Sequence, residues 1–168
     1  MPPCLDIYVV TSDRSTACIE RFLSHYADLS ADRRRQDYEV FLTDAGETAA
    51  TGTLADTLAY GLADLNRSFA LYFTSQLPKY THVLVYFGHQ GRLLLGLSIE
   101  YEEAGQLNQA LAEAVLERLC TEYRTETAVY DFELTPADAE VRWSRLGAQK
   151  QDVYYCCHDR KKEQDHAG

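Results

Sequence analysis

The chain has 168 residues and a formal net charge of −10 at pH 7, with 46 % hydrophobic and 25 % charged residues, a balance typical of soluble globular proteins. This length suits one domain with its own core, so we expect stability without a metal or disulfide. The negative charge disfavours nonspecific binding to nucleic acid or anionic membranes, because proteins bind these through lysine and arginine side chains. It favours a basic partner.

The first half of the chain predicts short strands alternating with short helices. Residues 5–11 are apolar and β-branched, which predicts a strand. A helix follows, because apolar residues recur at helical spacing: Ile19, Phe22, Leu23 and Tyr26. Its predicted N-cap is Asp13 or Ser15. The remaining predictions are a strand over 38–43, a small and polar loop over 44–53, a helix over 54–65 and a strand over 68–75.

The second half predicts a hairpin followed by helices and strands in alternation. The hairpin joins strands 82–87 and 92–100. An acidic connector over 100–106 leads to an amphipathic helix whose apolar face runs from Leu107 to Leu119. The last elements are a strand over 127–134, a helix over 136–146 that begins after Thr135 with Pro136 in its first turn, a strand over 152–157 and a polar tail.

The hairpin turn reads Gly-His-Gln-Gly, residues 88–91. A type I turn through His89 and Gln90, with Gly91 in the left-handed conformation, accounts for the glycine without any functional demand. The alternative is a site built on the histidine. In either case we expect His89 to be exposed at the tip, where it could contact a partner.

The order of elements mixes hairpins with helices, which indicates an α+β fold. We expect a single domain over 1–157, with a mostly antiparallel or mixed sheet and helices packed mainly on one face, followed by a polar tail over 158–168. The pattern does not fix the order of the strands in the sheet.

The N-terminal residues MPPCLDIYVV contain no basic leader, and no stretch approaches the ~20 apolar residues that a membrane-spanning helix needs. The five cysteines are an odd number and widely scattered, which does not resemble a disulfide framework. We therefore expect a cytoplasmic protein, not associated with a membrane, whose thiols stay reduced.

The densest group of chemically active residues is Cys156 to Asp159, CCHD. On a strand, Cys156 and His158 could converge while Cys157 points away, so zinc would need ligands from elsewhere, and Cys4 is the obvious further thiol. The chain has no nucleophile elbow, Walker loop, dinucleotide-binding motif or HExxH motif. We expect no cofactor or metal and no nucleic-acid partner. The lack of a recognisable catalytic motif favours a protein that is not an enzyme.

The acidic connector holds the candidate partner-binding residues, Glu100, Tyr101, Glu102 and Glu103, to which we add the hairpin-tip His89. Tyrosine often anchors interfaces, and carboxylates speed association with a basic partner. The alternative is a solvated loop, where negative charge is favourable because a helix N-terminus follows.

Small, acidic, single-domain α+β chains without catalytic motifs resemble, in general character, the immunity proteins that neutralise secreted bacterial toxins. That resemblance implies a non-catalytic protein-binding module that blocks a basic partner. The alternative is a small-ligand-binding protein or enzyme, which would use a pocket between sheet and helices with His82, His89 or a cysteine as its polar group. We expect a monomer or a homodimer; a dimer would pair through the apolar hairpin strands or an exposed sheet edge.

Overall fold

The computed structural model describes residues 3–32, 38–41, 48–100, 106–125, 127–146 and 154–155. Its main feature is a six-stranded sheet with the order β4-β5-β6-β1-β7-β8. The strands are β1 (Cys4–Thr11), β4 (Phe69–Thr74), β5 (His82–Phe87), β6 (Leu93–Glu100), β7 (Ala128–Phe132) and β8 (Tyr154–Tyr155). The neighbours pair antiparallel except β7 and β8, which are parallel.

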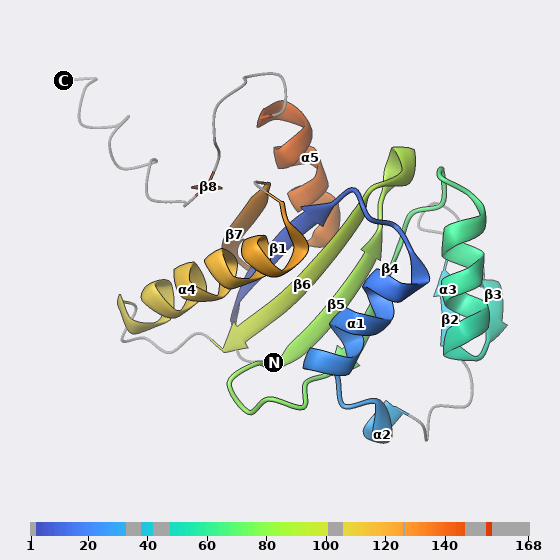
Figure 1. Cartoon of the computed structure of the whole chain (residues 1–168), viewed down its shortest axis with the longest axis horizontal. Coiled ribbons are helices and arrows are strands. Elements are labelled where there is room, and N and C mark those ends of the chain that lie inside the picture. The colour runs from blue at the N-terminus through green and yellow to red at the C-terminus, as the bar shows by residue number, and fades with distance from the viewer. Residues whose placement is uncertain are drawn as a thin grey trace.

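One face of the sheet is covered by three helices, α1 (Thr16–Tyr26), α3 (Leu54–Ala63) and α4 (Gln106–Tyr123). Figure 1 shows α1 and α4 lying across this face. Successive strand residues point to opposite faces, so Leu5, Ile7 and Val9 enter this core together. The alternate residues of the other strands, such as Val85 and Leu95, do the same. We call this the first face.

Among the described residues, one helix packs on the second face, α5 (Pro136–Leu146). Its Ala139 and Trp143 pack against a smaller core that includes Tyr8, Val10 and Leu94. The arrangement confirms the predicted α+β class, with a mostly antiparallel sheet and helices mainly on one face. In the part of the chain that the structure describes, the rest of the second face has no helical cover.

Two short strands form a separate sheet, β2 (Tyr38–Phe41) and β3 (Thr48–Gly52). In Figure 1 they lie with α3 beside the β4 edge of the main sheet. The prediction of a loop over 44–53 was wrong at Thr48–Gly52, because pairing with β2 orders a segment whose own residues show no strand pattern. A four-residue helix, α2 (Leu29–Asp32), was not predicted.

The hairpin prediction is confirmed: β5 and β6 pair in register from His82↔Ser98 to Phe87↔Leu93. The turn, η1, spans His89–Gly91, and Gly91 is left-handed at φ 75°, as predicted. Gln90 is also left-handed, at φ 57°, so the type I prediction was wrong, because that turn requires a negative φ at Gln90. His89 is exposed, as expected.

Candidate functional site

A row of polar residues crosses five strands on the second face. The register pairs Asp131 of β7 with Asp6 of β1, Asp6 with Ser98 of β6, Ser98 with His82 of β5, and His82 with Thr74 of β4. Directly paired residues of neighbouring strands point to the same face. These five residues, which we call the polar row, interrupt a sheet whose other strand positions are mostly apolar.

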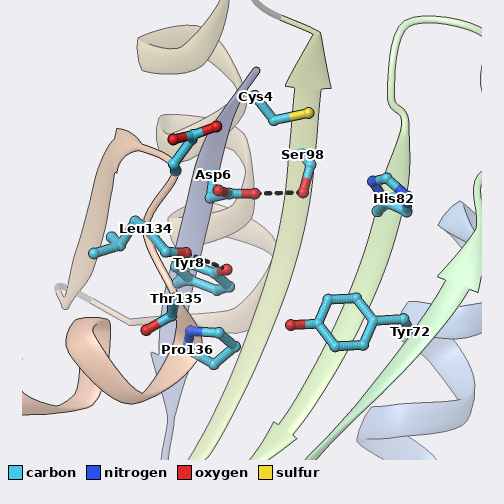
Figure 2. Close-up of a pocket in the computed structure, with 10 residues that line it drawn as sticks. Cys4, Asp6, Tyr8, Tyr72, His82, Ser98, Leu134, Thr135 and Pro136 are labelled. Carbon is cyan, nitrogen blue, oxygen red and sulfur yellow. Dashed lines mark hydrogen bonds between the residues drawn. The ribbon is translucent and has the colours of Figure 1, made fainter. Parts of the chain in front are cut away.

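The middle of the polar row lies in a pocket of about 590 Å³, within the usual range of ligand sites, about 300–1,000 Å³. Figure 2 shows Asp6 and Ser98 side by side, with Tyr72 pointing across the pocket toward the segment that follows β7. We call it the sheet pocket. Its ten lining residues are Cys4, Asp6, Tyr8, Tyr72, His82, Ser98, Glu133, Leu134, Thr135 and Pro136.

The segment between β7 and α5 forms one wall of the sheet pocket. Glu133 adopts the left-handed conformation at φ 47°, and its backbone N–H donates to the Cys4 carbonyl at 2.9 Å, which connects the turn to the first residue of β1. Thr135 then caps α5: its hydroxyl oxygen accepts from the Asp138 backbone N–H at 3.1 Å, as the Thr-Pro pattern predicted. The Leu134 carbonyl accepts from the Tyr8 hydroxyl at 2.8 Å.

Asp6 is the central carboxylate of the sheet pocket. The Ser98 hydroxyl donates to its Oδ1 at 2.6 Å, and the Leu134 backbone amide also donates to the carboxylate. Partial burial raises the pKa of Asp6, and these two hydrogen bonds offset the increase only in part. Among the residues that the structure describes, no lysine or arginine forms an ion pair with Asp6.

The neighbouring Asp131 shows the contrast. It belongs to the same polar row but forms an ion pair with Arg142 of α5. Two aspartates on adjacent strands therefore have different environments: one has a cation supplied by its own chain, and the other faces an open pocket.

The sheet pocket holds serine, histidine, aspartate and cysteine, but not in the order of a catalytic relay. Ser98 lies between Asp6 and His82, and its hydroxyl donates its hydrogen bond to the Asp6 carboxylate, whereas a serine nucleophile needs the histidine as its base. The Cys4 sulfur lies 3.5 Å from the Thr81 hydroxyl. Within the described part of the chain, no three His, Cys, Asp or Glu residues converge as metal ligands do.

The structure separates Glu100 from His89, the two predicted partner-binding residues that it describes. Glu100 ends β6, is exposed, and pairs with Cys4 beside the sheet pocket. His89 lies at the opposite end of the same strand, in η1. Tyr101, Glu102 and Glu103 lie outside the described residues, as do Cys156, Cys157 and His158.

The sequence pointed to part of this site and missed the rest. Alternation along β6 predicted that Ser98 and Glu100 share one face. His82 was among the residues predicted to supply the polar group of a ligand pocket. Asp6 was missed, although a carboxylate inside an apolar strand, LDIYVV, is a usable signal. Tyr72 and the segment after β7 had no signal, because only the strand order brings them beside Asp6.

No helix among the described residues combines the length and apolar character needed to cross a membrane.

No protein-family model matches the chain, and no curated protein matches it. Among solved structures, the chain is similar to the Pseudomonas aeruginosa T6SS protein PA0821, at 12 % identity and a TM-score of 0.38. The match covers 80 % of this chain and 44 % of that one, so this chain spans less than half of that protein's length. A likeness this low carries no argument about fold or function.

Proposed function

We propose that the protein is a non-catalytic binding module, of the immunity-protein kind, and that a basic protein partner docks on the part of the second face that α5 leaves uncovered. The observation that carries the proposal is Asp6, a half-buried carboxylate that lies in an open pocket and, among the described residues, forms no ion pair with a lysine or arginine of its own chain. A charge left uncompensated in this way favours a partner of opposite charge.

The surroundings of the sheet pocket support a basic partner. Glu133 lines the pocket and is exposed, and Glu100 lies on the same face one residue pair beyond Ser98. Glu100, the first residue of the predicted partner-binding surface, therefore lies beside this pocket. The net charge of −10 adds long-range attraction. Neutralisation would follow from occlusion of the partner's own functional surface.

Affinity capture tests this proposal. The tagged protein is immobilised and exposed to lysate of the source organism at low and at high salt. We expect a basic protein that is retained at low salt, released at high salt, and lost when Asp6 and Glu100 are both replaced by lysine.

The matched control replaces Glu20 and Glu117 by lysine, an equal change of charge on α1 and α4, which cover the first face. Both control positions are exposed. Equal retention by the two double variants, or no retained basic protein at all, would contradict the proposal.

The volume of the sheet pocket, with His82 and Cys4 in its lining, supports a second candidate function, binding of a small ligand. A thermal-shift screen against metabolites tests it. A compound that raises the Tm of the native protein but not that of a Tyr72→Ala variant would favour this second candidate. Tyr72 is 51 % exposed, so its truncation leaves the core intact.

A further inference from the structure

We infer that the sheet pocket receives a single lysine or arginine side chain of the partner, with Asp6 as its counter-ion. This inference rests on the proposed function and deepens it, because it assigns the recognition to one pocket and one kind of side chain.

The lining of the sheet pocket selects for a cation. None of its ten residues is lysine or arginine, whereas two, Asp6 and Glu133, are carboxylates. An anionic group would meet two negative charges there with only His82 as a titratable base. A neutral group would leave the Asp6 carboxylate, already withdrawn from water, without a counter-charge.

Asp6 has the capacity to accept a further donor. Ser98 donates to Oδ1, and the Leu134 amide supplies one more hydrogen bond, but a carboxylate offers about four acceptor positions. An ammonium or a guanidinium can use those that remain. A charge-assisted hydrogen bond at a half-buried position is roughly twice as strong as a neutral one.

The walls of the sheet pocket suit the alkyl stem that carries such a cation. Tyr72 approaches from β4 with its ring about half exposed, and Pro136 and Leu134 lie opposite (Figure 2). Lysine and arginine bury their methylene groups along apolar surface while the charged end finds a polar partner. The Tyr72 ring also offers its face to a cation. Burial and the charge of Asp6 both raise the pKa of Tyr72, which is consistent with a negative potential in the pocket.

The position of the sheet pocket favours a side chain presented by a protein. The lining residues come from β1, β4, β5, β6 and the segment after β7, so the pocket opens on the uncovered part of the second face. Exposed groups flank it, among them Tyr72, Glu133 and Glu100. A partner could therefore pack around the opening while one side chain enters.

Nuclear magnetic resonance titration of the ¹⁵N-labelled full chain tests the inference without the partner. The probes are N-acetyl-lysine-N-methylamide and N-acetyl-arginine-N-methylamide, and the uncharged control is N-acetyl-norleucine-N-methylamide. We expect saturable shifts of amides in β1, β6 and β4 with the two cations and not with norleucine. Asp6→Asn should weaken the binding by about tenfold or more, since it removes the counter-ion but keeps the shape.

Asp131→Asn is the matched control, because it makes the same chemical change one strand away, at a carboxylate that already has Arg142. Its probe affinity should remain that of the native protein. Tyr72→Ala provides a second variant at an exposed position, and it should weaken both cations.

Equal shifts with norleucine, no shifts with any probe, or equal affinity for native and Asp6→Asn proteins would each overturn the inference. The proposed function fails separately, when no basic protein is captured even though the cations bind. The inference alone fails when a captured partner is lost on reversal of Glu100 but retained by Asp6→Asn.

Discussion

Replacing Asp6 by asparagine keeps an acceptor for the Ser98 hydroxyl and removes a partly buried charge that destabilises the folded state. Since burial raises the pKa of Asp6, the folded state favours the protonated acid, and the ionised form destabilises it at neutral pH. We expect Asp6→Asn to raise the Tm at pH 7 by about 2–4 °C, the shift that about 1 kcal/mol causes in a domain of this size. Differential scanning fluorimetry measures it.

The same pKa shift gives this effect a pH dependence. Between the ordinary pKa of an aspartate and the raised pKa of Asp6, the folded state binds more protons than the unfolded state, so stability falls as the pH rises. The Tm advantage of Asp6→Asn should therefore disappear on acidification, when native Asp6 is also neutral. Asp131→Asn should instead lower the Tm at pH 7, because Arg142 loses its partner. An Asp6→Asn variant less stable than the native protein at neutral pH would contradict the argument.

Gly96 leaves room for the Tyr8 ring on the second face. A Cβ at Gly96 would lie 2.5 Å from Tyr8 Cδ1, closer than any real contact. Tyr8 is buried and its hydroxyl is bonded to Leu134, so the ring cannot move away freely. We expect Gly96→Ala to cost about 1–3 kcal/mol of unfolding free energy, the usual range for overpacking. Urea denaturation measures it, and a Tyr8→Leu background should reduce the cost; an equal cost in both backgrounds would show that Tyr8 is not the cause.

The helix α5 is held to the hairpin by an ion pair between the partly exposed Arg92 and the buried Glu140. Arg92 Nη1 lies 3.5 Å from Glu140 Oε1, its guanidinium is 4.0 Å from the Trp143 ring centroid, and the Tyr86 hydroxyl donates to Glu140 Oε2 at 3.1 Å. Removing Arg92 would leave a buried carboxylate without its cation. We expect Arg92→Met to cost about 3–5 kcal/mol, measured by chemical denaturation.

Arg92→Met combined with Glu140→Gln should recover part of that stability, because no buried charge is then unpaired. Arg142→Met is the comparison, since it breaks the Asp131 pair, whose arginine is more exposed than Arg92, and should cost less. A cost for Arg92→Met no larger than that for Arg142→Met would mean that α5 does not depend on the Arg92–Glu140 pair.

Most helices and strands could be predicted because each carries a local signal, either a periodicity or a β-rich composition. Alternation identified β4 and β6, helical spacing identified α1 and α4, and Thr135 marked the start of α5. β3 could not be predicted, since TAATG becomes a strand only through pairing with β2. The site was harder than the elements: alternation grouped residues within one strand, but the polar row exists only because β1, first in the chain, lies between β6 and β7. Such long-range pairing leaves no local signal.

For the molecule as a whole, the net charge of −10 and the Asp6 carboxylate in the sheet pocket should act on different steps of binding. Surface charge acts during the approach of the partner, whereas a charge pair formed inside a pocket acts on dissociation. We expect lysine at Glu100, Glu102 and Glu103 to slow association with the captured partner, more strongly at low salt, with little change in the dissociation rate. Asp6→Asn should speed dissociation and leave association nearly unchanged.

Stopped-flow or surface-plasmon measurements across a salt series separate these two steps. A pair of lysines at Glu102 and Glu103 can be compared with a pair at Glu20 and Glu117, which makes an equal change of net charge on the helices of the first face. If net charge alone governs the approach, both pairs slow it equally, and the acidic connector is no more than a solvated loop before α4. If the connector guides the partner to the sheet pocket, the Glu102 and Glu103 pair slows association more. The difference between the two pairs should then vanish as salt shortens the Debye length to a few ångströms.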